Sequence, residues 1–354
     1  MRIVSSLFCG FVLSLSADAP ATVQWTPLSS GVTVRLRGVS APSTDVAWAS
    51  GQGGTVIRTV DGGRTWETRS IPDAAALDLR DIEAHDARTA IAMSAGPGDG
   101  SRIFRTGDGG AHWTQVYVAP LAGMFLDALA FSSHQHGVAV SDAVEGAFVL
   151  LTTTDGGRTW QRVPADRLPP ALPQEGAFAA SGTNVAVHGR HVWVGTTAGR
   201  VLRSADDGRT WTVGATPVAT GEATGIFSLA MRDASHGVVV GGNYTKESAA
   251  IDNAAVTSDG GATWRPSRGL SGYRSVVAPV AGGGARAWLA VGPTGADLSL
   301  DDGATWTAAG GEGYDALTVA PGGRVAYASG AGGRLARVSL GGAAAPVTSP
   351  VRNR

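Results

Sequence analysis

The sequence predicts an all-β fold, a seven-bladed β-propeller of four-stranded antiparallel blades, from three observations. An eight-residue motif recurs six times along the chain, at about the spacing of propeller blades, which is roughly 40–50 residues. Short runs of β-branched and apolar residues flank each copy, as expected for strands joined by tight turns. The 51 glycines among 354 residues follow no Gly-X-Y period, so they indicate many turns and exclude a collagen helix.

The recurring motif is Ser/Thr-x-Asp-x-Gly-x-Thr/His-Trp, first seen as TVDGGRTW at 59–66. Its aspartate can accept backbone N–H groups across a tight turn, and its glycine supplies a conformation that other residues resist. Its tryptophan opens the next strand and can pack against a neighbouring repeat. We therefore predict a scaffold hairpin turn in each copy, with structural aspartates at Asp61, Asp108, Asp155, Asp206, Asp259 and Asp301.

Each unit has four strands, which in the first unit are VRLRGVSA, DVAWASG, GTVIRT and WETRSI. Seven inner strands are expected near residues 35, 79, 126, 183, 226, 273 and 314. The seventh unit lacks both the motif and an outer strand. Residues 23–28, which include Trp25, resemble the strand that follows a motif. We therefore expect the N-terminal strand to pair with the last blade and to close the ring, which removes the exposed sheet edges.

The ends of the chain differ from the repeats. Residues 1–19 have a positive start, an apolar stretch and small residues before Pro20, which is the pattern of a secretory signal peptide. The single cysteine, Cys9, lies inside it. We expect a propeller over 20–340, a disordered tail over 341–354, and an exported, periplasmic protein. No later stretch is apolar and long enough to cross a membrane, and a closed propeller is expected to be a monomer.

Composition and motifs exclude several classes of function. The formal net charge is −1 and only 16% of residues are charged, so no basic field exists for nucleic acid. Each motif supplies one carboxylate at its aspartate position, whereas hard cations require six or more oxygens, so we expect no metal site. No zinc, P-loop or nucleophile-elbow pattern is present, so we expect no cofactor.

Alignment of the seven inner strands at their first turn brings one position of each together. Since the strand starts converge on the channel mouth, the three arginines at this position could form a fork for a carboxylate or a phosphate. Alternatively, the arginines pair with Asp81, Asp127 and Asp315 and have only a structural role. The aligned residues are Arg37, Arg80, Asp127, Asn184, Phe227, Arg274 and Asp315.

Two long connections interrupt the repeats. The first, 241–256, is longer and more polar than its equivalents, and inserted loops on a rigid scaffold often bind ligands. Tyr244 and Lys246 are its binding candidates, and the alternative is a solvated insertion without a role. The second, 164–182, is rich in Pro and Ala, contains Glu175, and either covers the same face or is a plain linker.

The six motifs resemble the Asp-box (BNR) repeat of sialidases and other propellers. The fuller unit, LRGVSAPSTDVAWASGQGGTVIRTVDGGRTW, resembles the blade pattern of the photosystem II stability/assembly factor family and its bacterial relatives. This resemblance implies a seven-bladed propeller that binds protein partners and helps to assemble membrane complexes. We accordingly expect an exported, non-enzymatic binding propeller that presents its channel mouth to a protein partner or an anionic ligand.

The alternative is a glycosidase of sialidase type that acts on a glycan. Such an enzyme needs an acid/base aspartate and a tyrosine–glutamate pair, and two carboxylates roughly 5–10 Å apart would favour it. The sialidase Arg-Ile-Pro signature is absent, and VRLRGVSAP stands in its place. An endo-glucanase is less favoured, since such enzymes usually pair two propellers. The candidate residues are Asp81 or Asp127, Tyr273 or Tyr244, and Glu222 or Glu175.

Overall fold

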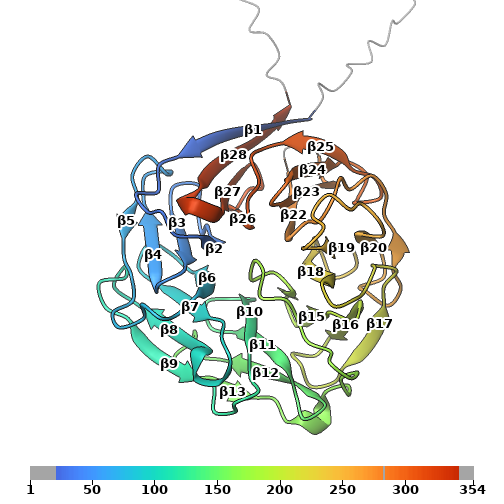
Figure 1. The fold of residues 1–354 in the computed structure, drawn as a ribbon, viewed down its shortest axis with the longest axis horizontal. Coiled ribbons are helices and arrows are strands. Elements are labelled where there is room, and N and C mark those ends of the chain that lie inside the picture. Colours follow the sequence, from blue (N-terminus) through green and yellow to red (C-terminus); the bar gives the residue numbers. More distant parts are fainter. Residues whose placement is uncertain (1–20, 282–283, 343–354) are drawn as a thin grey trace, which may run out of the picture.

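A computed structural model describes residues 21–281 and 284–342. This part of the chain forms seven four-stranded antiparallel sheets arranged radially around a central axis (Figure 1). The predicted fold class is thereby confirmed. The expected signal peptide, 1–19, lies outside the described residues, as does most of the expected tail, 341–354. The last strand runs to Gly342, so the first two residues of that tail belong to the propeller.

Blades 1 to 4 follow one another along the chain, each built outward from its inner strand. Their strands are β2 (Leu36–Ser40), β3 (Ala47–Gly51), β4 (Thr55–Thr59), β5 (Glu67–Thr68); β6 (Leu79–Ala84), β7 (Ala90–Ser94), β8 (Arg102–Thr106), β9 (Thr114–Val118); β10 (Leu126–Phe131), β11 (Gly137–Val144), β12 (Ala147–Thr153), β13 (Gln161–Arg162); and β14 (Val185–His188), β15 (His191–Gly195), β16 (Arg200–Ser204), β17 (Thr212–Ala215).

Blades 5 to 7 complete the ring, and three short 3-10 turns lie in connections. The strands are β18 (Thr224–Met231), β19 (Gly237–Asn243), β20 (Ala254–Thr257), β21 (Arg265–Pro266); β22 (Val276–Val280), β23 (Ala287–Gly292), β24 (Gly295–Ser299), β25 (Thr307–Gly310); and β26 (Ala316–Val319), β27 (Val325–Ser329), β28 (Leu335–Gly342), with β1 (Ala21–Leu28) outermost. The 3-10 turns are η1 (Gly98–Gly100), η2 (Ala165–Arg167) and η3 (Ala331–Gly333).

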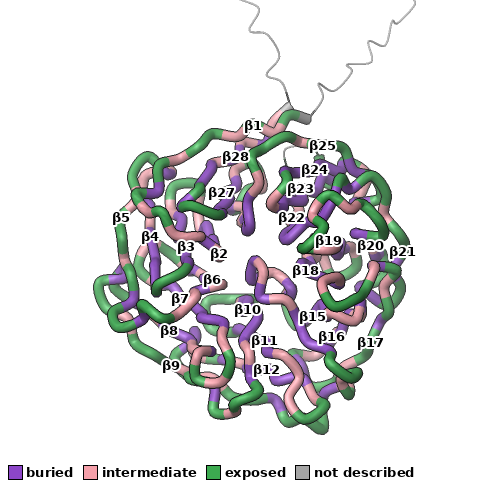
Figure 2. The backbone as a smooth tube through the Cα atoms, in the orientation of Figure 1, coloured by how far each residue is buried: buried purple, intermediate pink, exposed green. Residues whose placement is uncertain are grey.

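The core consists of the layers between blades. Strands β3 and β7 are buried along their whole length, whereas the outer strand β5 is exposed (Figure 2). Apolar side chains from each pair of neighbouring blades form one cluster, and seven such clusters complete the ring. Because both faces of every sheet are covered, the second strand of a blade, such as β7, is apolar along most of its length and does not alternate with polar residues.

The motif turn works as predicted from its residues. In the first copy, Thr59 Oγ1 donates to Asp61 Oδ1 at 2.8 Å and accepts the backbone N–H of Gly63 at 3.0 Å. The Asp61 carboxylate also accepts the backbone N–H and the hydroxyl of Thr65, at 3.0 and 2.7 Å. Gly63 has φ +87 and packs against Leu28, so a side chain there would be strained and would clash.

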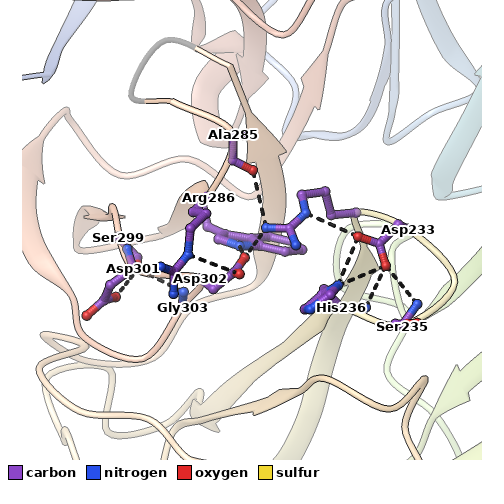
Figure 3. Close-up of polar contacts among 11 residues, drawn as sticks. Asp233, Ser235, His236, Ala285, Arg286, Ser299, Asp301, Asp302 and Gly303 are labelled. Carbon is purple, nitrogen blue, oxygen red and sulfur yellow. Dashed lines mark hydrogen bonds and ion pairs between the residues drawn. The ribbon is translucent and has the colours of Figure 1, made fainter.

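Two of the six motifs carry an additional aspartate, and one of these ties two blades together. Asp207 and Asp302 have φ values of +61 and +67, in the left-handed region that aspartate tolerates better than most residues. Asp302 pairs with Arg232 of blade 5. It also pairs with Arg286 of its own blade (Figure 3). It also accepts the indole N–H of Trp288 at 3.2 Å, so the turn of blade 6 is fixed to blade 5.

The ring is closed as expected, by the N-terminal strand. Strand β1 pairs antiparallel with β28, from Ala21 opposite Gly342 to Leu28 opposite Leu335. Trp25 stacks on Tyr314 with ring centroids 5.3 Å apart and donates its indole N–H to the carbonyl oxygen of Ala309 at 3.0 Å. The first strand of the chain is therefore held by blades 6 and 7.

Substitution Trp25→Ala is expected to lower the free energy of unfolding by about 2–3 kcal/mol, because it removes a stacked ring and an indole hydrogen bond. Urea denaturation followed by tryptophan fluorescence measures this change. The exposed Leu300→Ala variant is the control and should change the free energy by less than about 0.5 kcal/mol. Equal midpoints for both variants would contradict the closure role of Trp25.

The motif aspartates predict that the protein loses stability at acid pH. Hydrogen bonds from Thr65 to Asp61, and from Thr263 to Asp259, lower both pKa values to about 2. A carboxyl whose folded pKa is depressed stabilises the fold above its unfolded pKa, and this contribution is lost as pH falls through the folded pKa. We therefore expect the unfolding free energy to fall between pH about 4 and about 2.

Circular dichroism during urea titration at each pH measures this loss of stability at acid pH. Burial raises the pKa of Glu83 to about 7, and its contribution has the opposite slope, lost as pH rises from about 4 to about 7. The Glu83→Gln variant should therefore keep the loss of stability below pH about 4 and show a smaller loss between pH about 4 and about 7, where the buried carboxyls of Asp81 and Asp127 contribute in the same direction. A free energy that stays constant between pH about 4 and about 2 would contradict the role of the motif carboxylates.

Candidate functional site

A β-bulge recurs at the start of the inner strands. The register of pairing with the second strand shifts at Arg37 in β2, Arg80 in β6, Asp127 in β10 and Phe227 in β18. A bulge residue is released from the ladder, so its side chain can be turned away from the sheet. These are four of the seven positions that the sequence alignment brought together. The alignment thus identified a repeated backbone feature.

A cavity of about 440 Å³ opens at this end of the channel. Three arginines and two carboxylates line it, and aromatic rings form much of the remaining wall. The lining residues are Arg35, Arg37, Arg80, Phe178, Ala179, Ala180, Phe227, Tyr244, Glu247, Tyr273, Pro293 and Asp315.

Two arginines from neighbouring blades share one acceptor. Arg37 Nη2 and Arg80 Nη1 both donate to the carbonyl oxygen of Ala179, at 3.3 and 3.2 Å. Arg80 also pairs through Nε with Asp78 at 2.9 Å. Each guanidinium carries five N–H donors, so both retain donors beyond these bonds. The Arg37 Nε atom is buried and has no partner among the described residues.

The third arginine of the cavity is Arg35, which binds Asp315 through Nε and Nη2, both at 2.7 Å. Arg37 differs from the other two because no carboxylate pairs with it in the described part of the chain. Burial, together with the charges of Arg80 and Arg35, lowers the pKa of Arg37. An anion in the cavity would relieve this repulsion.

The connection between β13 and β14 enters the channel. Its residues 175–184, here called the plug, extend towards the centre of the ring and are largely buried (Figures 1 and 2). The carboxylate of Glu175 pairs with Arg200 at one end of the plug. At the other end, Ser181 Oγ donates to the carbonyl oxygen of Ser275 at 2.7 Å. The connection is thus more than a linker, because it forms one wall of the cavity.

Aromatic rings from four parts of the chain meet on the other side of the cavity. Phe178 of the plug stacks on Phe227 with centroids 3.7 Å apart and ring planes 5° apart. Tyr273 meets the edge of Phe227 at 4.7 Å, and Tyr244 lies within 6.4 Å of both phenylalanines. The carbonyl oxygen of Glu247 accepts the N–H of Tyr273 at 2.8 Å, so the inserted loop of blade 5 is held against the site.

The structure places Arg274 away from the cavity. Its side chain is 1% exposed and pairs with Asp297 at 2.7 Å. It also donates to Ser271 Oγ at 2.5 Å and to Thr294 Oγ1 at 3.0 Å. These neighbours satisfy the guanidinium inside blade 6, because Asp297 on β24 and Ser271 before β22 both reach it. Arg274 is therefore a scaffold residue.

Two other predicted site residues do not line the cavity either. Asp127 is 1% exposed, and neither of its carboxylate oxygens has a hydrogen-bond partner among the residues described. Burial, and secondarily the Asp142 carboxyl, raises its pKa. Lys246 is next to the lining residue Glu247 but is not part of the wall. Of the predicted set, the structure brings together Arg37, Arg80 and Tyr244.

Two of the four carboxylates considered for a glycosidase are engaged elsewhere, and the other two, Asp127 and Glu222, do not line the cavity. Glu175 binds Arg200, and Asp81 accepts the backbone N–H groups of Ile82 and Leu129 at 2.8 and 2.7 Å. The cavity wall contains only Glu247 and Asp315 as acids, and Asp315 is bound by Arg35. Over residues 21–281 and 284–342, no cluster of three His, Cys, Asp or Glu side chains is arranged to hold a metal ion.

The same described residues include no helix with the length and apolarity needed to span a bilayer.

Comparison with known proteins finds similarity to one family. A family model described as photosynthesis system II assembly factor YCF48 matches residues 111–277. A solved structure described as YCF48 bound to D1 peptide has a TM-score of 0.61 and 16% identity, covering 90% of this chain and 98% of that chain. YCF48 from Cyanidioschyzon merolae has a TM-score of 0.61 and 18% identity, covering 88% and 98%. No curated protein sequence matches the chain.

Substitution Arg274→Ala is expected to destabilise the protein by about 3–5 kcal/mol, because it leaves the buried Asp297 carboxylate without its partner. The double variant Arg274→Met/Asp297→Leu should recover most of this loss, since it removes both charges. Urea denaturation measures both variants, with the exposed Arg268→Ala as the control. A midpoint for Arg274→Ala equal to that of the control would contradict the scaffold role.

Proposed function

Because this chain is a seven-bladed Asp-box propeller that resembles the photosystem II assembly factor family, we propose that it is an exported, non-enzymatic binding propeller. Its arginine-lined cavity takes an anionic group of a protein partner, and the surrounding loops contact the rest of that partner. The observation that carries this proposal is Arg37, a partly buried cation that shares a neutral carbonyl oxygen with Arg80 and lacks a carboxylate of its own.

The charge of the cavity supports an anionic ligand. Planar guanidinium groups bind carboxylates through paired N–H donors, and such charge-assisted bonds are stronger than neutral ones. Arg35 is neutralised by Asp315 and Arg80 by Asp78. Arg37 is therefore left without a paired carboxylate among the described residues, although Glu247 also lines the cavity, and the remaining donors of Arg37 can bind an anion.

The aromatic wall supports a protein partner over a free inorganic anion. Phe178, Phe227, Tyr244 and Tyr273 can pack against an apolar group of a ligand held at the arginines, since aromatic side chains contribute strongly to binding surfaces. Tyr244 is 47% exposed and Ile251 is 72% exposed, and both lie on the inserted loop of blade 5. One protein of the same fold has been solved with a peptide, described as the D1 peptide.

The exported location is part of the proposal and rests on residues 1–19. If the segment is a signal peptide, protein recovered from the envelope fraction should begin near Ala19 or Pro20.

A pull-down from envelope extract tests the proposed function. Purified wild type should retain specific membrane-protein partners, and Arg37→Ala/Arg80→Ala should retain them roughly tenfold less or worse, because hydrogen bonds to charged groups are lost. The matched control is Arg162→Ala/Arg209→Ala, which removes two exposed arginines remote from the cavity. Quantitative mass spectrometry of the bound fractions measures the difference.

Equal retention by the cavity variant and the control would refute the assignment of the site. Failure of wild type to retain any partner, combined with release of sugar from a sialylated glycan, would favour the glycosidase alternative instead.

A further inference from the structure

The tip of the plug, residues 178–180, lies between the two halves of the cavity. On one side the Ala179 carbonyl oxygen accepts from Arg37 and Arg80. On the other side Phe178 stacks on Phe227. No other short segment of the cavity wall makes contacts of this kind with both the guanidinium groups and the aromatic rings in the described part of the chain.

The shared carbonyl oxygen solves an electrostatic problem. Arg37 and Arg80 come from adjacent blades, and their charges repel each other, which contributes to the lowered pKa of Arg37. A carbonyl oxygen has two lone pairs and can accept from both groups at once. It therefore holds the two guanidinium groups near each other without neutralising either one.

The position of the tip is set from both ends of the plug. Before the tip, the backbone N–H of Ala177 donates to Asp142 Oδ1 at 2.9 Å. After it, Ser181 is bonded to the carbonyl oxygen of Ser275, and Asn184 Nδ2 donates to the carbonyl oxygen of Phe178 at 3.0 Å. The tip is thus held by blades 3 and 6 and by Asn184, where the plug joins β14 of blade 4, independently of the arginines.

The cavity exists with the plug in place, because Phe178, Ala179 and Ala180 are part of its wall. A ligand of suitable size therefore enters without displacing the plug. We propose that the plug tip is a positioning element of the binding site, which holds the Arg37 and Arg80 guanidinium groups and the Phe227 ring in their binding geometry before the ligand arrives. This inference rests on the proposed function and specifies how the site is preorganised.

Two small carboxylates separate the contribution of the arginine half of the cavity from that of the aromatic half. Acetate can contact the arginine half alone, and 3-phenylpropionate can also reach the aromatic half. NMR titrations of the arginine Nε–Hε signals measure the affinity of each probe for the purified protein. For Phe178→Ala we expect acetate affinity to fall roughly fivefold or more, because loss of the stack lets Ala179 shift and the two guanidinium groups separate. Affinity for 3-phenylpropionate should fall further.

Control variants distinguish a positioning role of the plug tip from an effect on folding and from simple contact with the ligand. Phe178→Tyr keeps the stack and should restore the affinity for both probes. Ser181→Ala removes one anchor of the plug and should lower acetate affinity in the same direction by a smaller factor. Thermal denaturation of each variant shows whether it remains folded at the temperature of the titration.

If Phe178→Ala leaves the acetate affinity unchanged and lowers only the affinity for 3-phenylpropionate, Phe178 contacts the ligand without positioning the arginines. That result would overturn the inference. Increased acetate affinity would show that the plug competes with the ligand, and would also overturn it. The proposed function fails separately, if wild type and Arg37→Ala/Arg80→Ala bind both probes equally or not at all.

Discussion

Each blade of this protein is a twisted sheet with two apolar faces, and neither face can be left in water. The seven inter-blade clusters satisfy this requirement only when the ring is complete, so every other feature depends on closure. The pairing of β1 with β28 supplies the final contact. The Asp-box turns hold the outer strands at the face remote from the cavity, where their hydrogen bonds are satisfied within each turn.

Function can vary at positions that this closed scaffold does not use. The bulges in β2, β6, β10 and β18 release one residue per strand from the ladder. Arginine, aspartate and phenylalanine all occupy such positions, so the backbone feature is kept while the side chain changes. Long connections can likewise be added to the same end of the channel, and the plug and the inserted loop of blade 5 both supply cavity residues.

The sequence repeats made the fold predictable. Part of the site was not predicted, because it lies in segments that do not repeat. Six motifs and an unpaired Trp25 strand determine the number of blades and the closure. Arg274 matched Arg37 in the alignment. Its neighbours Asp297 and Ser271 belong to one blade only, and no repeated pattern in the sequence indicates that they bind it. Arg35 was missed because it precedes the aligned turn. The path of the plug could not be read from a Pro- and Ala-rich segment, since its anchors are distant in sequence.

The buried and half-buried arginines of the structure differ in what compensates their charge. Arg274 has Asp297, Arg200 has Glu175 and Arg35 has Asp315, so each of these three cations is compensated by a carboxylate. Compensation is the expected state, because an unpaired buried charge is costly. Arg37 has instead a carbonyl oxygen and a neighbouring cation. Under the proposed function, an anionic group bound at Arg37 would supply the compensation that the scaffold does not provide.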